Sequence, residues 1–323
     1  MKRHGLIWCA AFVILDAVQA VYAGAVLQKV DAFLLGAAVF GPPAAATLLW
    51  AAWRSPGQLA AALARPHDLI GLNISAALGW AAYLAGIQFI EPAVAFALFS
   101  GIIPLVTLAA GRFGVMLAGK TTGRTEGIGH AVLAVGIGTL ALLTLSGHSG
   151  FVREGADAAM AGLGLVLVGG GSIGAMLLFG KRLDRHGVGP AAQFGLRFPL
   201  YLLVATMGAS QGWEAKPPVA PTELATVLAI GLAVLAFPIY AVQKAISLVS
   251  PLTIAIAAAT TPVITFLLQI PEGRVSFAPA TLAGLTVCFA GALLAAVGRA
   301  QSARALVTTG HRDADDGGGE DQT

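Results

Sequence analysis

The chain has 323 residues, of which 57% are hydrophobic and only 11% are charged, and its mean hydropathy is +0.82. Soluble domains carry about 25% charged residues, so this composition excludes an ordinary soluble protein. The net charge of +3 does not indicate nucleic-acid binding, because membrane proteins carry a basic excess on their cytoplasmic side. Cys9 and Cys288 fall in apolar runs without metal-ligand spacing, so we expect no disulfide, no metal site and no cofactor.

Ten apolar runs are separated by short polar or charged segments. Each has about 20 residues, the number that a helix needs to cross a hydrocarbon core about 30 Å thick. The sequence therefore predicts an all-α membrane protein with ten transmembrane helices, lying in the plasma or inner membrane. The predicted spans are 5–28, 31–53, 68–90, 92–111, 126–146, 159–181, 190–210, 222–244, 250–270 and 276–298.

The two ends of the chain differ in character. The N-terminal apolar run could be a cleaved signal peptide, but Asp16 and Gln19 interrupt it, so we expect it to remain as the first span. Residues 299–323 are polar, Gly-rich and acidic near their end, and they cannot bury enough apolar surface to fold. We therefore predict a disordered cytoplasmic tail.

The distribution of Lys and Arg predicts the orientation in the membrane. Counted on alternate sides of ten spans, 14 lie on the side of the two termini and 4 on the other side. Arg197, inside a predicted span, completes the total of 19. Because basic residues concentrate in cytoplasmic loops, both termini are predicted to be cytoplasmic.

A repeated sequence motif predicts an internal duplication. Pro104-Leu-Val-Thr107 returns as Pro262-Val-Ile-Thr265, each time in the fourth span of a set of five. We assign residues 1–146 to the first repeat, 147–158 to a linker and 159–298 to the second repeat. Because five spans is an odd number, the second repeat enters the membrane from the other face, and the two are predicted to be inverted repeats.

Several stretches resemble the drug/metabolite transporter superfamily, in its EamA-like branch. In the first half, Glu91-Pro92 begins the stretch that leads to Pro104. The second half is more similar: it runs from Tyr240 through Thr261-Pro262 to Pro271-Glu272-Gly273, followed by Gly284 and Gly291, and Arg197 stands where the repeat often carries an Arg. The first half departs from the pattern, since it lacks the acidic residue after its fourth span and has Pro42-Pro43 in its second.

This resemblance covers nearly the whole chain and implies a fold and an activity. It implies a ten-helix transporter that often exports amino acids or related metabolites. It also implies a central cavity lined mainly by the first, third, fourth, sixth, eighth and ninth helices.

Asp16 is the most informative polar residue, since it lies about 16 Å into the first span, near the middle of the hydrocarbon core. A carboxylate there costs about 2.5 to 3.5 kcal/mol, so it must face a wet cavity, pair with a cation or be protonated. Gln19 and Tyr22 follow on the same helical face. We predict that Asp16 and Gln19 bind a substrate or a coupling proton; the alternative is a hydrogen bond between helices.

The sixth span carries Gly169-Gly170-Gly171-Ser172 at a matching depth. Gly170 and Gly171 could kink the helix and free backbone groups toward a ligand, with Ser172 beside them, or could allow close helix packing. Gly170 to Gly174 also spells G-x-S-x-G, but that hydrolase motif requires a strand-to-helix turn, which the sequence does not offer. We predict no catalytic residue and no enzyme.

Pro104 and Pro262 each lie near the middle of a predicted span, where proline removes one backbone hydrogen bond and kinks the helix. Their roles are either kinking alone or exposure of carbonyl groups to a cavity. The hydroxyl groups nearby could bond the freed carbonyls or line the pathway. These candidate lining residues are Ser100, Thr107, Thr260, Thr261 and Thr265.

Trp80, Tyr83 and Tyr240 are candidates for stacking on a substrate, although Trp and Tyr near span ends also act as interfacial anchors. Arg197 lies about 10 Å from the end of its span, so its side chain could extend to the cytoplasmic headgroups or pair with Asp16.

The sequence therefore predicts a secondary transporter of a small polar metabolite, working outward by alternating access between the two repeats. The G-x-x-x-x-G-K-[ST] pattern is absent, so a gradient, which could be a proton gradient, or exchange must supply the energy. The alternative is a non-transporting membrane scaffold, in which glycine-rich faces pack within the chain or against a second copy in a homodimer. These glycines are Gly129, Gly136, Gly138, Gly284 and Gly291.

Overall fold

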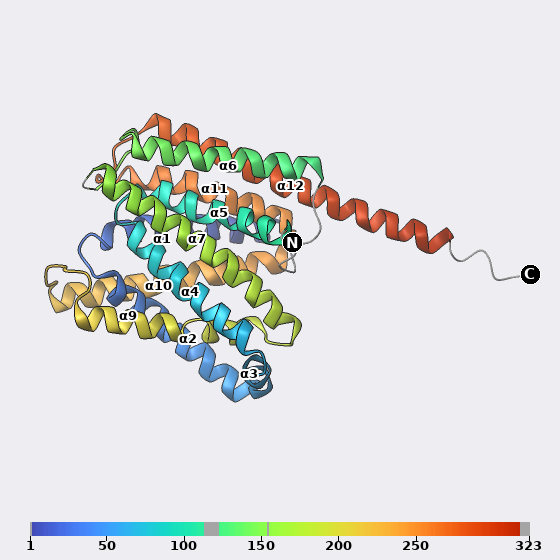
Figure 1. The fold of residues 1–323 in the computed structure, drawn as a ribbon, viewed down its shortest axis with the longest axis horizontal. Helices are drawn as coiled ribbons and strands as arrows, with labels where there is room; N and C mark the ends of the chain where they lie inside the picture. Colours follow the sequence, from blue (N-terminus) through green and yellow to red (C-terminus); the bar gives the residue numbers. More distant parts are fainter. Residues whose placement is uncertain (1, 113–122, 154, 317–323) are drawn as a thin grey trace, which may run out of the picture.

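Helices make up the fold. The computed structural model describes residues 2–112, 123–153 and 155–316, and Figure 1 shows a single bundle beyond which the last helix projects. Side chains at 2–3, at 304–316 and at several positions from 235 to 251 are outside this description. The helices are α1 (Lys2–Val26), α2 (Ala32–Arg54), α3 (Pro56–Leu63), α4 (Pro66–Gly86), α5 (Pro92–Arg112), α6 (Arg124–Leu145), α7 (Ala156–Arg185), α8 (Pro190–Leu196), α9 (Pro199–Gln211), α10 (Pro221–Leu248), α11 (Pro251–Gln269) and α12 (Pro279–Asp316).

Eight of the described helices are long and apolar enough to cross a membrane, namely α1, α2, α4, α5, α6, α7, α11 and α12. The prediction of a helical, multi-pass membrane protein is confirmed at this level. In α10 the stretch Pro221–Val234 is apolar but shorter than these eight helices. The run predicted as one span over 190–210 is divided between α8 and α9.

The division of α8 from α9 has a local cause. Pro199 begins α9, and a proline has no N–H to continue the backbone ladder of α8. Asn73 of α4 compensates at this break, because its Nδ2 donates to the Leu196 carbonyl (2.8 Å) and its Oδ1 accepts from the Leu200 N–H (3.3 Å). A polar side chain from a neighbouring helix therefore stabilises a break that would otherwise leave backbone groups unpaired in an apolar layer.

Glycines bring α6 and α12 into close antiparallel contact. A Cβ atom at Gly136 would lie 2.8 Å from the backbone nitrogen of Cys288, and one at Gly284 would meet Leu140. Gly129 and Gly291 likewise face the partner backbone, whereas a Cβ at Gly138 would meet nothing within 4 Å. These glycines were predicted to pack either within the chain or against a second copy, and four of the five pack within the chain.

Three other helix pairs run antiparallel, as their contacts show. Along α4 and α7, and along α1 and α10, rising residue numbers on one helix meet falling numbers on the other. The segment α8–α9 runs beside α2 in the same way. The contacts are Gly71 with Phe179, Gly79 with Ile173 and Gly86 with Val166; Gly5 with Leu248 and Tyr22 with Val227; and Gly36 with Tyr201 and Leu48 with Gly195.

The bundle has two distinct ends. We call the end that carries the ion pairs Arg182–Asp68 (3.3 Å) and Arg299–Glu126 (3.1 Å) the basic end. At the opposite end, hydrogen bonds connect the segments 24–32, 88–93, 150–153, 214–216 and 269–281.

The C-terminal region differs from the prediction of a disordered tail from residue 299, because α12 continues to Asp316. The segment around residues 299–302 is bonded to the start of α6. Arg299 pairs with Glu126 of α6, and the N–H of Gly123, the residue before α6, donates to Ser302 Oγ (3.1 Å). Residues 317–323 lie outside the described part.

We predict that Gly291→Leu destabilises the protein strongly while Gly138→Leu does not. The added side chain at Gly291 would meet the Leu133 backbone, and overpacking costs about 1 to 3 kcal/mol or more, whereas Gly138 faces open space. Thermal unfolding of both variants in the same detergent checks this. Equal melting temperatures would show that α6 and α12 do not pack as described.

Candidate functional site

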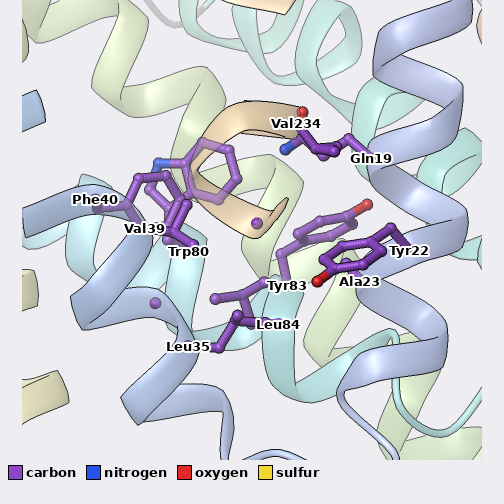
Figure 2. A pocket seen from close by; sticks show the side chains of 12 residues that line it. Gln19, Tyr22, Ala23, Leu35, Val39, Phe40, Trp80, Tyr83, Leu84 and Val234 are labelled. Carbon is purple, nitrogen blue, oxygen red and sulfur yellow. The ribbon is translucent and has the colours of Figure 1, made fainter. Parts of the chain in front are cut away.

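A small cavity lies between α1, α2, α4 and α10, and Figure 2 shows side chains converging on it from these four helices. Its volume is ≈ 40 Å³, enough for a few water molecules or one small polar group. Most of its wall is apolar. The lining residues are Gln19, Tyr22, Ala23, Leu35, Gly36, Val39, Phe40, Trp80, Tyr83, Leu84, Gly231 and Val234. We call it the central cavity.

Four polar side chains meet in this wall, namely Gln19, Tyr22, Trp80 and Tyr83. Tyr22 donates its hydroxyl to the Val227 carbonyl of α10 (2.8 Å). The indole Nε1 of Trp80 is buried and has no hydrogen-bond partner among the described residues. A buried unpaired donor costs about 1 to 3 kcal/mol, which a ligand atom or a water molecule in the cavity would offset.

Aromatic packing fixes the orientation of the Trp80 ring. Its centroid lies 4.7 Å from that of Phe40, 6.3 Å from that of Tyr83 and 6.1 Å from that of Phe99. Tyr83 and Phe99 are themselves 4.2 Å apart. Rings held by several neighbours have few rotamers, so the Trp80 N–H is held in one direction.

Asp16 is half-buried on α1, one turn from Gln19, and lies close enough to Tyr83 for electrostatic interaction. It makes no hydrogen bond or ion pair with any side chain in the described part of the chain. The interhelical hydrogen bond considered for Asp16 is therefore not formed there, and Asp16 lies beside the central cavity rather than in its wall.

A polar cluster lies at the opposite end of the bundle, one turn beyond Ala23 of the central cavity. Lys216 Nζ donates to the Leu27 carbonyl (2.8 Å) and to Gln88 Oε1 (2.7 Å). Gln88 Nε2 donates to Glu214 Oε1 (2.9 Å), and Glu214 Oε2 accepts from the Ala32 N–H (2.9 Å). Burial lowers the pKa of Lys216, and the nearby Glu214 opposes this shift. We call this the Lys216 cluster; it joins three separate interhelical connections.

A second buried cluster surrounds Glu91, which has no exposed surface. Its carboxylate accepts hydrogen bonds from the Gly150 N–H (2.7 Å), from Thr281 Oγ1 (3.1 Å) and from Gln269 Nε2. Gln269 Oε1 in turn accepts from the Ala93 N–H (3.1 Å). Burial raises the pKa of Glu91, and the three donors oppose the rise. The cluster joins α5, α11 and α12 at the opposite end.

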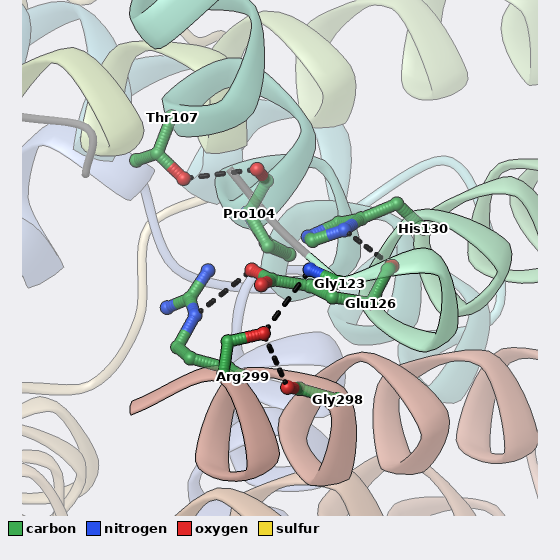
Figure 3. Close-up of polar contacts among 8 residues, drawn as sticks. Pro104, Thr107, Gly123, Glu126, His130, Gly298 and Arg299 are labelled. Carbon is green, nitrogen blue, oxygen red and sulfur yellow. Dashed lines mark hydrogen bonds and ion pairs between the residues drawn. The ribbon is translucent and has the colours of Figure 1, made fainter. Parts of the chain in front are cut away.

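A larger cavity of ≈ 720 Å³ lies between α5, α6, α11 and α12. Ser100, Pro104 and Pro262 all line it, so the structure brings together three predicted residues at a place separate from Gln19, Trp80 and Tyr83. At the basic end it reaches Arg299, and Figure 3 shows the polar contacts around this residue. We call it the basic-end cavity.

The threonines bond differently from expectation. Pro104 and Pro262 lie inside α5 and α11 as predicted, so the carbonyls deprived of a donor are those of Ser100 and Ala258. Thr107 donates instead to the Pro104 carbonyl (2.9 Å), and Thr265 to the Thr261 carbonyl (2.9 Å). Each threonine therefore bonds a carbonyl one turn earlier in its own helix, and not the carbonyl that the proline leaves without a donor. Thr261 and Thr265 are fully buried and line neither cavity.

The glycines of α7 serve packing. The helix is continuous from Ala156 to Arg185, and a Cβ at Gly170 would strike the backbone of Phe99 in α5, while Gly171 has more space. Ser172 lies within this continuous helix and lines neither cavity, so the turn that a hydrolase serine requires is absent from α7. Gly170 therefore allows α7 to approach α5 closely.

Arg197 lies at the break between α8 and α9, where its guanidinium carbon is 4.4 Å from the ring centroid of Phe194 and 4.9 Å from that of Phe198. No ion pair with Asp16 occurs among the described side chains. The side chain of Tyr240 lies outside the described residues.

Sequence reasoning missed the Lys216 cluster and did not propose His130, which lines the basic-end cavity, as a binding residue. Single polar residues in loops carry no pattern that predicts which loops meet. His130, however, is an ionisable residue within an apolar run, which is itself a signal of function.

No family model matches the chain, and no curated protein matches it. One solved structure, described only as "Crystal structure of protein", is similar, with a TM-score of 0.57 and 19% identity over 93% of this chain and 99% of that one. At this identity the likeness shows a shared fold and nothing about activity.

The Glu91 cluster predicts a pH dependence of stability. Because folding raises the pKa of this carboxyl, its contribution to stability is fully present below the unfolded pKa and is lost as the pH rises through the folded pKa. The melting temperature of the wild type minus that of Glu91→Gln should therefore fall as the pH rises from acid toward neutral. A difference that grows over this range would contradict the burial of Glu91.

Proposed function

We propose that this protein is a secondary transporter, not an enzyme, that moves small polar metabolites such as amino acids outward by alternating access. The observation that carries the proposal is the central cavity, whose wall brings together Gln19, Tyr22, Trp80 and Tyr83 one helical turn from Asp16. A buried pocket with a few converging polar groups is the usual form of a binding site for a small molecule.

The pairing of helices supports ten spans arranged as two inverted repeats. In that arrangement α8–α9 and α10 are the seventh and eighth spans, and repeat symmetry relates each span to the one five places later. The contact of α1 with α10 then corresponds to that of α7 with α4, while α2 meets α8–α9, α5 meets α11 and α6 meets α12. Each of these five contacts is mapped onto itself or onto another of the five, as a pseudo-twofold axis in the membrane plane requires.

We place the basic end in the cytoplasm of a cell whose plasma or inner membrane holds the protein, with both termini on that side. The excess of Lys and Arg supports this placement. The Lys216 and Glu91 clusters then lie at the outer face. The hydrogen bonds of the Lys216 cluster tie together three connections at this end, so on this proposal release of a substrate outward requires the Lys216 cluster to break.

Within the proposal, Asp16 binds the substrate ammonium or a coupling proton, and the central cavity, with a volume of ≈ 40 Å³ in this conformation, holds one small polar group of the substrate. A carboxylate in the middle of the hydrocarbon layer is costly unless it has such a partner. Gln19 supplies both a donor and an acceptor, whereas Trp80 supplies a donor only. The pair suits a zwitterion whose carboxylate accepts from Trp80.

Flux measurements test the proposal. Proteoliposomes should take up or release radiolabelled amino acids, and Asp16→Asn should reduce the rate by at least about tenfold, a loss equivalent to about 1.4 kcal/mol. Absence of flux for a broad panel of amino acids and metabolites, with and without a pH gradient, would refute the transporter. Normal flux of Asp16→Asn at every pH would refute only the role of the carboxylate.

The Trp80 N–H can be tested separately. Trp80→Phe keeps a ring but removes the donor, so KM should rise roughly three- to tenfold, the value of one hydrogen bond of about 0.5 to 1.5 kcal/mol. Trp50→Phe is the matched control, because Trp50 is an exposed residue of α2, away from the cavity. Equal KM values for the two variants would remove Trp80 from the site.

A further inference from the structure

The basic-end cavity has the size and wall of a binding site in its own right. Its volume of ≈ 720 Å³ lies within the range of about 300 to 1,000 Å³ that small-molecule sites occupy. Nine of its 20 lining residues are alanines from α5, α11 and α12, and Leu133, Leu252 and Phe289 add to the apolar wall. It reaches the surface at Ser250 and Arg299, the latter with 67% of its side chain exposed.

His130 of α6 presents an unsatisfied acceptor in this wall. The residue is only 3% exposed, and its Nδ1 lies 2.9 Å from the Glu126 carbonyl oxygen. A carbonyl oxygen only accepts, so Nδ1 carries the hydrogen, and in the neutral ring Nε2 holds a lone pair. Nε2 is buried without a partner among the described residues. Figure 3 shows the ring directed from α6 toward Pro104 of α5, another lining residue.

The charges around the cavity favour a neutral ligand. Arg299 is the charged residue in the described lining, and its Nε already pairs with Glu126 Oε1 at 3.1 Å. An ammonium deep in the cavity would have no counter-charge among the described lining residues, and a carboxylate there would face the lone pair of His130 Nε2; burying an uncompensated charge is expensive. A neutral hydroxyl group can donate to Nε2 without this cost.

We propose that the basic-end cavity binds a membrane-soluble long-chain alcohol, with the hydroxyl donating to His130 Nε2 and the alkyl chain lying against the alanine-rich wall. The Ser100 carbonyl, deprived of its usual donor by Pro104, offers a second acceptor nearby. This site is distinct from the central cavity and does not depend on the proposed transport.

Binding of tritiated 1-hexadecanol to the full-length protein in lipid nanodiscs tests the proposal, with hexadecyl methyl ether, hexadecylammonium and hexadecanoate as competitors. The alcohol should bind saturably at one site per chain. The ether, which has the same chain but no donor, should compete at least about tenfold less well, as should the two ions. Equal competition by the ether would overturn the hydrogen bond to His130.

Variants locate the site. His130→Leu should weaken alcohol binding by at least about tenfold, whereas His130→Gln, which places an amide oxygen near the position of Nε2, should retain most of it. Ala259→Phe, which fills the cavity from α11 while keeping His130, should abolish binding. Gln19→Leu in the central cavity should leave it unchanged, and melting temperatures identify variants that fail to fold. Unchanged binding in folded His130→Leu and Ala259→Phe proteins would overturn the proposal.

Discussion

The constraint on which the rest of the structure depends is that polar groups inside an apolar layer must find partners within the protein. The chain meets this constraint at most places with side chains from neighbouring helices. Asn73 bonds both sides of the α8–α9 break, and Glu91 receives three donors from three separate segments. Some buried side-chain atoms still lack a partner among the described residues, namely atoms of Trp80, His130, Arg182, Arg197, Thr261 and Arg274. Of these residues, Trp80 and His130 line the two cavities, where a bound molecule could supply the partner.

Close packing at glycines determines where those cavities lie. Along α6 and α12, and along α4 and α7, glycines allow the backbones to approach so closely that no cavity opens between the two helices. The two cavities lie where four helices meet, one beside large side chains and the other beside an alanine-rich wall. Phe40, Trp80 and Tyr83 surround the central cavity, and Pro104 and Pro262 interrupt the regular ladders of α5 and α11 beside the basic-end cavity. Helix packing and site formation thus have one cause.

The sequence predicted the membrane class and the approximate position of the long helices, because runs of about 20 apolar residues leave few alternatives. It also predicted the grouping of Gln19, Trp80 and Tyr83, although Ser100 lies at the other cavity and Ser172 at neither. The break at Pro199 was missed because its repair depends on Asn73, more than 100 residues earlier. Likewise, the bonds of Thr107 and Thr265 depend on local helix geometry, which a spacing argument does not resolve.

Cross-linking the end of the bundle that carries the Lys216 cluster tests the proposed alternating access most directly. Cysteines at the exposed positions Lys29 and Ala215, on connections joined by the Lys216 cluster, can be bridged by a short cleavable bis-maleimide after Cys9 and Cys288 are replaced. Transport in proteoliposomes should stop on cross-linking and return on cleavage of the linker, because substrate release requires these connections to separate. Full transport by the cross-linked protein would contradict the account.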